Sequence, residues 1–354
     1  MIKNKNLLVW YSKNKRNLPW RKTFNPYKIW ISEIMLQQTQ VKTVIPYYLN
    51  WIKKFPNVQA LAKASESKVL KAWEGLGYYS RARNIHYSAK QIVEKHSGKF
   101  PKTFEDILEL KGIGRYTAGA IASIAFDQRK PILDGNVERV LSRFFWIQGL
   151  IKTKENQNKL WKLAEEILPN KKCGDFNQAL MELGATICKP VSADCEICPL
   201  QKNCLASKQA NPEGIPELPK RNTIRRYRTA LIINYQNQIL ALHRQEQRLL
   251  NGLWELPGME LTAKQGSDQK KIIKAIGIYM KKEFNLEPEL IKFIQKSKYG
   301  ITKYQIDLNI FETKVNSVGH LESNSKWLKP AQLKKLPMAG HQKNVLQKIG
   351  VFKK

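Results

Sequence analysis

Residues 110–120 read Leu-Lys-Gly-Ile-Gly-Arg-Tyr-Thr-Ala-Gly-Ala, where two glycines separate the end of one predicted helix from the start of the next. Gly112 and Gly114 allow a tight turn that leaves backbone N–H groups facing outward at the second helix's N-terminus. Lys111 and Arg115 add positive charge on either side. Such a turn suits a DNA phosphate, a contact that positions a protein without reading sequence. An ordinary helix–helix turn is the alternative, because Gly-x-Gly also occurs there.

The overall charge favours the phosphate interpretation. The chain has 354 residues with 61 Lys+Arg against 29 Asp+Glu, a formal net charge of +32. A balance this basic attracts polyanions, of which nucleic acid is the commonest in a cell. Hydrophobic residues at 42% and charged residues at 25% exclude a disordered chain and a membrane protein. The length predicts two domains.

The chain divides into three parts by composition. Residues 1–206 show helical spacing without strand alternation, residues 207–227 have the prolines and basic cluster of a linker, and residues 228–354 mix strands and helices. The expected fold is therefore a mostly α region followed by an α+β domain. The expected helices are one opened by Asn25-Pro26, then 40–54, 103–110, 115–126, 136–147, 157–168 and 269–284; the expected strands are 229–235, 239–244 and 300–312.

Four of the five cysteines form the strongest chemical signal. They are spaced as Cys188-x6-Cys195-x2-Cys198-x5-Cys204, so four thiolates can surround one inorganic centre. Zinc also takes four thiolates, but zinc ribbons usually have paired x2 spacings. The uneven spacing favours an iron–sulfur cluster over zinc. Cys173 lies outside the pattern and is expected to be a buried core thiol.

Two carboxylates are candidates for catalysis. Glu33 is the only acidic residue in residues 1–65, and it lies on a predicted helix among apolar side chains. Such surroundings raise a carboxyl pKa, which suits a general acid near neutral pH. Asp134 precedes another predicted helix and could cap it. Paired with Glu33, it could instead stabilise a sugar cation during glycosidic cleavage. Surface and capping roles are the alternatives.

Two further segments have the character of DNA-contacting loops. One is Leu36-Gln37-Gln38-Thr39-Gln40, and the other runs from Gly75 to Arg83 and places Leu76 and Tyr78 beside arginines. Apolar and aromatic side chains of this kind can enter a duplex from which a base has been extruded. A tyrosine pair packed in a core is the alternative.

The location of the protein is predicted from two absences in the sequence. No uncharged apolar run approaches the roughly 20 residues that cross a bilayer, and the N-terminus lacks a signal-peptide core. We therefore expect a cytoplasmic protein that does not bind membranes. We further expect a monomer of bacterial type that is associated with the nucleoid.

These features occur together, in this order, in the endonuclease III superfamily of helix-hairpin-helix DNA glycosylases. The sequence most resembles the adenine DNA glycosylases of the MutY type. The matching runs are Leu18 to Arg21, Ser32 to Val41, Gly75 to Arg81, Gly112 to Gly119, Ile132 to Val137 and the four-cysteine loop. The resemblance implies a helical catalytic region with a [4Fe–4S] cluster. It also implies excision of adenine mispaired with 8-oxoguanine or guanine in double-stranded DNA.

One position separates two reaction types within this superfamily. Bifunctional relatives carry a lysine directly after Gly-x-Gly-Arg, and its amine forms a Schiff base with the sugar. In this sequence the residue is Tyr116. The resemblance therefore implies a monofunctional glycosylase that leaves an abasic site.

The resemblance also implies a role for each residue. Glu33 would protonate adenine and assist the attacking water, and Asp134 would stabilise the oxocarbenium ion. Tyr116 and Asn136 would orient the two carboxylates. The implied DNA contacts are Gln38, Leu76, Tyr78, Lys111, Gly112, Gly114 and Arg115.

Residues 228–354 resemble the Nudix-like C-terminal domain of these glycosylases. Between Gly258 and Phe284 the only acids are Glu260, Asp268 and Glu283, so the glutamate-rich helix that holds Mg²⁺ in a Nudix hydrolase is missing. The domain is expected to bind rather than hydrolyse. Family members read the oxidised guanine with a Phe-Ser-His loop, and here Ile301 and Thr302 are followed by Lys303 in place of the histidine.

Three rival functions remain at the level of sequence. They are a bifunctional glycosylase and lyase, a non-catalytic DNA-binding protein with structural zinc, and a nucleotide-pool hydrolase built on the C-terminal domain. Tyr116 disfavours the first, the cysteine spacing disfavours the second, and the missing carboxylates disfavour the third.

Overall fold

The computed structural model describes all residues except 1, 3, 220–221, 246–249, 267 and 353–354. The chain forms two compact units. Unit 1 comprises residues 1–64 and 84–220, and unit 2 comprises residues 65–83 and 221–354. Residues 65–83, from the middle of the helical region, thus pack with the C-terminal part of the chain. None of the described helices is long and apolar enough to cross a membrane.

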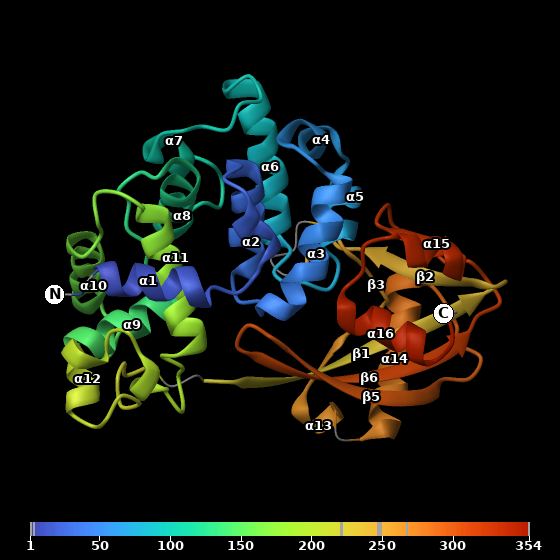
Figure 1. The fold of residues 1–354 in the computed structure, drawn as a ribbon. Coiled ribbons are helices and arrows are strands. Elements are labelled where there is room, and N and C mark those ends of the chain that lie inside the picture. Colours follow the sequence, from blue (N-terminus) through green and yellow to red (C-terminus); the bar gives the residue numbers. More distant parts are fainter. Residues whose placement is uncertain (1, 3, 220–221, 246–249, 267, 353–354) are drawn as a thin grey trace. The chain divides into compact units, whose positions relative to one another are not determined.

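Unit 1 is helical, as predicted (Figure 1). Helix α8 packs against both α2 and α11, and α11 also contacts α1 and α9. The α-helices of this unit, with α6 continuing into it from unit 2, are α1 (Asn4–Asn14), α2 (Pro26–Leu36), α3 (Val41–Lys54), α4 (Val58–Lys63), α6 (Ser80–Lys95), α7 (Phe104–Leu108), α8 (Arg115–Phe126), α9 (Gly135–Phe145), α10 (Lys154–Glu166), α11 (Cys173–Thr186) and α12 (Leu205–Lys208); its short 3-10 helices are η1 (Pro19–Lys22), η2 (Cys195–Ile197) and η3 (Gln201–Asn203).

Helix α2 begins as its sequence predicts. The Asn25 side chain accepts a hydrogen bond from the Lys28 backbone N–H at 3.2 Å, and Pro26 occupies the first turn, where a missing N–H costs nothing. From Tyr27 to Met35 every residue except Lys28 is buried. The helix is therefore enclosed on nearly all sides, and any polar side chain on it lies in the interior.

The glycine hairpin between α7 and α8 depends on a close approach to Asn84 of α6. Gly112 has φ +81°, and a Cβ atom there would lie 2.7 Å from the Asn84 Cβ. Only glycine fits, both for its backbone conformation and for space. Gly114 caps α8 without a side-chain hydrogen bond, so the first N–H groups of α8 have no side-chain cap.

Unit 2 contains a mixed sheet of seven strands in its described part. Strands β3, β2, β1, β6 and β5 are neighbours in that order, with β4 paired to β1 and β7 to β2. Strands β1 and β6 run parallel, and the other pairs run antiparallel. The elements are α5 (Glu66–Trp73), β1 (Ile224–Tyr235), β2 (Gln238–His243), β3 (Trp254–Glu255), β4 (Glu260–Leu261), α13 (Ala263–Gly266), α14 (Gln269–Phe284), β5 (Lys292–Ile301), β6 (Tyr304–Lys314), β7 (Ser325–Leu328), α15 (Pro330–Lys335) and α16 (Gly340–Lys348).

Each face of this sheet buries its own apolar core. On one face Ile310 packs with Leu333 of α15 and Leu346 of α16, and on the other Phe311 packs with Ile276 of α14. Neighbouring residues of β6 therefore enter opposite cores, as the alternation of side chains along a strand requires.

The prediction of one continuous strand over residues 300–312 is wrong in one respect. The structure ends β5 at Ile301 and begins β6 at Tyr304, so a hairpin turn interrupts the alternating segment. Thr302 has φ +53° in that turn. The periodicity is the same in both strands, which is why the pattern alone did not reveal the turn.

Part of the segment predicted as a linker packs against unit 1. Ile215 is buried, and the Ile151 backbone N–H donates to the Glu217 carbonyl at 3.0 Å. Strand β1 already begins at Ile224. The exact domain limits of 1–206 and 228–354 stay a prediction from sequence.

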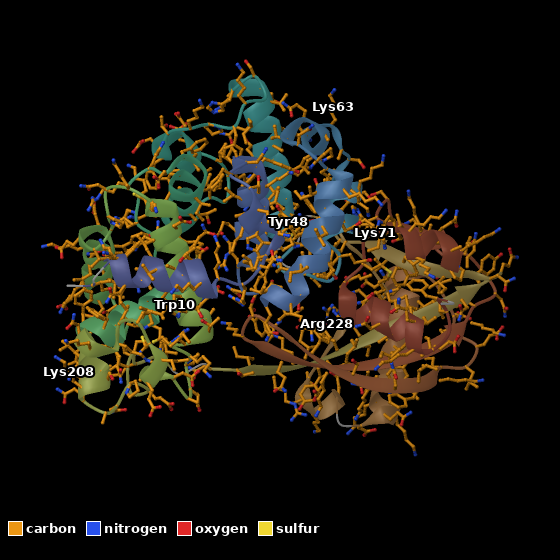
Figure 2. The ribbon with its side chains drawn as sticks, in the orientation of Figure 1. Trp10, Tyr48, Lys63, Lys71, Lys208 and Arg228 are labelled. Carbon is orange, nitrogen blue, oxygen red and sulfur yellow. The ribbon has the colours of Figure 1, made fainter. Side chains whose placement is uncertain are left out.

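Basic side chains are spread over both units. Figure 2 shows the long side chains on the ribbon, among them Lys63 and Lys208 in unit 1 and Lys71 and Arg228 in unit 2. The positive charge is thus distributed over each unit rather than confined to one tail.

Candidate active site

Glu33 is buried, with only 5% of the residue exposed. Its Oε2 accepts a hydrogen bond from the Tyr116 hydroxyl at 2.6 Å. Burial raises the pKa of Glu33 from 4.5 to about 7, partly offset by the Tyr116 bond and reinforced by the negative charge of Asp134. A pKa in this range leaves the carboxyl able to carry a proton near neutral pH, which is the state a general acid needs.

Asp134 lies at the start of α9 and combines capping with a second set of contacts. Its Oδ1 accepts from the backbone N–H groups of Asn136 and Val137 at 3.1 and 2.8 Å, and its Oδ2 accepts from the Asn136 amide Nδ2 at 2.9 Å. Burial raises the pKa of Asp134, and these hydrogen bonds oppose the rise. The capping alternative is thus correct as geometry. In this capping position the Asp134 carboxylate lies near Glu33, and its negative charge raises the pKa of Glu33.

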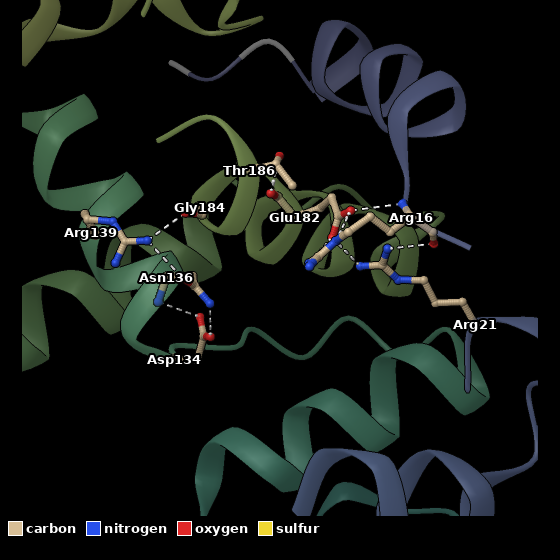
Figure 3. A network of polar contacts seen from close by, with 8 residues as sticks. All are labelled: Arg16, Arg21, Asp134, Asn136, Arg139, Glu182, Gly184 and Thr186. Atoms are coloured by element: carbon tan, nitrogen blue, oxygen red, sulfur yellow. Dashed lines mark hydrogen bonds and ion pairs between the residues drawn. The ribbon is translucent and has the colours of Figure 1, made fainter. Parts of the chain in front are cut away.

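Asn136 connects Asp134 to Arg139, and Figure 3 shows this path from Asp134 to Gly184. The Asn136 Oδ1 accepts from Arg139 Nη2 at 2.9 Å. Arg139 also donates to the Gly184 carbonyl at 2.7 Å and, through Nε, to the Cys188 carbonyl at 2.8 Å. A chain of hydrogen bonds therefore runs from Asp134 to the backbone of the first cysteine of the loop.

Helix α11, which contains Gly184, also carries a buried ion-pair network. The sequence did not predict this network. The Glu182 side chain is fully buried and accepts hydrogen bonds from Arg16 at 2.8 Å and from Arg21 at 2.8 Å (Figure 3). Burial alone would raise the pKa of Glu182, but the two arginines hold it at about 2. The positive charge of Arg21 also lowers the pKa of Glu33. The run from Leu18 to Arg21 pointed to Arg21, but no sequence signal identified Glu182 as its partner.

The four cysteines of the spaced pattern surround one cavity. Cys188, Cys195, Cys198 and Cys204 all line a pocket with an empty volume of about 320 Å³, its opening to solvent included. The guanidinium of Arg143, itself buried, donates to the Cys188 sulfur at 3.4 Å.

The four thiols line the same pocket. Among the described residues no three His, Cys, Asp or Glu side chains are placed to hold a single metal ion. A zinc ion holds its four sulfurs at about 2.3 Å, whereas a multinuclear cluster spreads its ligands further apart. The four thiols together supply the donor set that either kind of centre would use. Cys173 lies apart from the pocket and is buried, as predicted.

The glycine hairpin presents charge at the start of α8. Lys111 and Arg115 are exposed, and each lies over an aromatic ring: Lys111 Nζ is 4.4 Å from the Tyr87 centroid, and the Arg115 guanidinium carbon is 4.0 Å from that of Trp161. The rings restrict these cations beside N–H groups that lack a side-chain cap. Gln38, also in unit 1, is exposed with φ +56° just after α2.

Of the two side chains predicted to enter a duplex, the structure exposes one. Tyr78 is 45% exposed and has φ +46°, a strained conformation for a residue with a Cβ atom. Leu76 is only 6% exposed in this structure, and its contact with DNA stays a prediction. The sequence pattern could not separate them, because both lie on the same glycine-rich turn.

The predicted lesion-reading residues lie at the tip of the β5–β6 hairpin. Thr302 is exposed, and its hydroxyl donates to the Ile301 carbonyl at 2.6 Å. Lys303 Nζ lies 5.6 Å from the centroid of the Tyr304 ring. The tip therefore presents one hydroxyl and one cation.

The three acids between Gly258 and Phe284 have separate partners. Glu260 pairs with Arg226 at 2.9 Å, Asp268 accepts from the first N–H groups of α14, and Glu283 contacts Lys282. These carboxylates do not converge on α14.

Comparison with known proteins extends the assignment over most of the chain. Residues 31–166 match the family described as HhH-GPD superfamily base excision DNA repair protein, and residues 228–348 match the NUDIX domain. The chain is 44% identical over 260 residues to the adenine DNA glycosylase of Buchnera aphidicola subsp. Schizaphis graminum, covering 73% of this chain and 75% of that protein. It is 39% identical over 325 residues to that of Buchnera aphidicola subsp. Baizongia pistaciae, covering 91% and 84%.

Solved structures support the helical fold. A thermostable thymine-DNA glycosylase aligns with a TM-score of 0.53 at 32% identity, covering 58% of this chain and 95% of that one. An endonuclease III from a non-covalent DNA complex aligns with a TM-score of 0.50 at 21% identity, covering 59% and 99%, which shows a shared fold alone. The sequence relatives extend past this helical region, and so the chain as a whole belongs to the adenine DNA glycosylase family.

Proposed function

We propose that this protein removes adenine mispaired with 8-oxoguanine or guanine from double-stranded DNA, leaving an abasic site. The observation that carries the proposal is the buried Glu33, hydrogen-bonded by Tyr116 and raised to a pKa of about 7 beside Asp134. The membership of the family and the position of Tyr116 support both the substrate and the reaction type.

The first step is cleavage of the glycosidic bond. The protonated Glu33 donates its proton to a ring nitrogen of the extruded adenine, so the base leaves with the electron pair of the C1′–N9 bond. Positive charge then develops on the sugar, and the Asp134 carboxylate stabilises it. Asn136 holds that carboxylate in place through the 2.9 Å bond from its amide.

The second step adds water to the sugar. Glu33, now a carboxylate, accepts a proton from a water molecule as the oxygen bonds to C1′. The Tyr116 hydroxyl keeps its hydrogen bond to Glu33 through both steps. The burial that raises the pKa of Tyr116 well above 10 keeps it protonated, so it does not act as a nucleophile.

A base-release assay tests the proposal. Duplexes with adenine opposite 8-oxoguanine, adenine opposite guanine, and thymine glycol are incubated with the protein, and strand breakage is scored with and without alkali. Release of adenine followed by alkali-dependent breakage is expected. Release of thymine glycol, or a covalent DNA adduct trapped by borohydride through a lysine, would favour the bifunctional alternative instead.

The rate is expected to fall as pH rises through about 7. Burial raises the pKa of Glu33 to about 7, so the protonated fraction declines above that pH, by about tenfold per pH unit once the group is mostly ionised. Single-turnover rates between pH 5.5 and 9 measure this decline. A rate that stays flat to pH 9 would contradict the assignment of Glu33 as the acid.

We infer that the four thiolates hold a [4Fe–4S] cluster. The residues that would hold it are Cys188, Cys195, Cys198 and Cys204, which line one cavity of suitable donor chemistry. When bound, such a cluster would cross-link the loop whose Cys188 carbonyl anchors Arg139. The expected result is a brown protein with about four irons and matching sulfide per chain. A colourless protein with one zinc per chain would contradict the inference.

The DNA contacts remain proposals. Lys111, Gly112, Gly114 and Arg115 would hold a phosphate at the start of α8, since uncapped N–H groups and two cations are present there. Gln38 and Tyr78 would enter the opened stack. A monomeric state and a cytoplasmic, nucleoid-associated location in a bacterial cell also remain predictions from the sequence.

Thr302 is proposed to read the oxidised guanine through its hydroxyl at the hairpin tip. Thr302→Ala is expected to lower the preference for 8-oxoguanine over guanine by about tenfold, the cost of one or two hydrogen bonds. Competition binding with the two duplexes measures this preference. Thr302→Ser is the matched control, because it keeps the hydroxyl, and an unchanged preference in the alanine variant would exclude this role.

A further inference from the structure

Side chains of unit 2 hold the loop that carries Tyr78 in a strained backbone conformation. The Trp73 indole N–H donates to the Gly77 carbonyl at 3.0 Å, and Arg81 Nη2 donates to the carbonyls of Leu76 and Gly77 at 3.0 and 3.1 Å. The Arg81 guanidinium also lies 5.6 Å from the Tyr78 ring centroid. A left-handed tyrosine persists only where the surrounding contacts outweigh its strain.

The carboxylate of Glu74 contacts the C-terminal domain at the start of this loop. Glu74 Oε1 accepts from the Met338 backbone N–H at 2.9 Å, and Oε2 contacts the ammonium groups of Lys343 on α16 and of Lys71, the latter at 2.9 Å. Only 6% of the Glu74 side chain is exposed. Charge-assisted bonds of this kind, shielded from water, are stronger than surface ion pairs.

Neighbouring contacts reinforce the same attachment. The Lys71 ammonium donates to the carbonyls of Lys334 and Leu336 at 2.8 Å each. The Tyr79 hydroxyl accepts from the Gly75 N–H at 3.2 Å and donates to the Met338 carbonyl at 3.3 Å. Both ends of the loop are therefore tied to the segment that leads from α15 into α16.

We propose that Glu74 is a positioning residue that fixes the Gly75–Tyr79 loop on the Nudix-like domain, so that Tyr78 and the Thr302 hairpin form one rigid reader. This rests on the proposed function, in which Tyr78 enters the duplex and Thr302 meets the opposite base. Both lie in the same compact unit. A contact made at Thr302 would then help to hold Tyr78 in the stack, and lesion recognition would support extrusion of the adenine.

The attachment itself is tested without DNA. Amide hydrogen exchange is followed in the full-length wild type, Glu74→Gln and Lys343→Met. The reporters are the amides of Gly75 and Leu76, which are hydrogen-bonded to the Tyr79 hydroxyl and the Trp73 carbonyl. Both variants are expected to exchange there at least about tenfold faster, with the β1 and β6 amides unchanged. Unchanged exchange at Gly75 and Leu76 would overturn the proposal.

The matched control for this experiment is Glu94→Gln. Glu94 is an exposed residue of α6 outside this network, so its loss of charge should leave the loop amides unaffected. Unaltered exchange in β1 and β6 shows that each variant has folded. If Glu94→Gln accelerated amide exchange in the loop as much as Glu74→Gln does, the acceleration would be a general effect of lost charge. Glu74 would then have no specific role in fixing the loop.

The functional consequence is tested by a double-mutant cycle of Glu74→Gln and Tyr78→Ala. The readout is the fluorescence of 2-aminopurine placed beside a non-cleavable adenine analogue opposite 8-oxoguanine. If Glu74 acts through Tyr78, each single change lowers the unstacking signal and the double change lowers it no further. Additive losses would overturn the proposal.

Failure of the proposed function gives a different pattern. A wild-type protein that releases no adenine, or a Tyr78→Ala variant with normal unstacking, would contradict the proposed function or the role of Tyr78. The exchange measurement would still decide whether Glu74 holds the loop, since it involves no substrate.

Discussion

Glu33→Gln is expected to abolish adenine release, by about 10³-fold or more, while binding of the mispaired duplex is retained. Glutamine occupies nearly the same volume and can still accept the Tyr116 hydrogen bond, but it has no proton of suitable acidity for the leaving base. Single-turnover base release measures the rate, and titration with a non-cleavable duplex measures the affinity. Release near the wild-type rate would show that another group is the acid.

Stability supplies the control that this variant is folded. The ordinary pKa of 4.5 applies to Glu33 in the unfolded chain, and about 7 applies in the folded protein. The stabilisation from its protonated form is complete below pH 4.5 and is lost as pH rises through 7. Glutamine does not ionise, so the variant should exceed the wild type in stability at pH 8 by about 3 kcal/mol. A less stable variant would indicate damage to the fold instead.

Glu182→Ala is expected to destabilise unit 1 by about 3–5 kcal/mol at pH 7, because it leaves two arginines without their buried partner. In a unit of this size that lowers the melting temperature by about 2–4 °C per kcal/mol. Calorimetry of the intact protein measures the shift. Glu94→Ala, on an exposed surface, is the control and should leave the melting temperature unchanged.

The difference in stability between the wild type and Glu182→Ala is expected to depend on pH in one direction. Since the arginines lower the pKa of Glu182 to about 2, its contribution is complete above pH 4.5 and is lost as pH falls through 2. The gap between wild type and variant should therefore be constant from pH 5 to 7 and shrink in more acid solution. A gap that widens on acidification would contradict an ionised Glu182.

The two candidate carboxylates could be named from the sequence because their signals are local. A solitary acid among apolar residues on a helix pointed to Glu33, and an Asp-Gly-Asn start to a helix pointed to Asp134, with surface and capping roles as the alternatives. Whether Glu33 was buried could not be decided from α2 alone. It depends on α3 and α8, which pack against that helix, and α8 brings the Tyr116 hydroxyl within 2.6 Å.

Contacts between distant segments escaped the sequence analysis. Glu182 and Arg16 are 166 positions apart, and Glu74 and Lys343 are 269 apart, so no pattern of spacing joins either pair. Leu76 and Tyr78 lie on the same glycine-rich turn in the sequence, whereas the fold buries Leu76 and exposes Tyr78.

The sequence by itself determined the kind of chemistry. The residue types, the cysteine spacing, the tyrosine after Gly-x-Gly-Arg and the loss of Nudix glutamates are covalent facts that no folding can alter. The tertiary structure decided which of these groups share an environment: it buries Glu33 beside Asp134, places four thiols around one cavity and attaches the Tyr78 loop to the C-terminal domain. A pKa or a strained loop depends on desolvation and on partners brought in from elsewhere in the chain, and only the folded molecule supplies them.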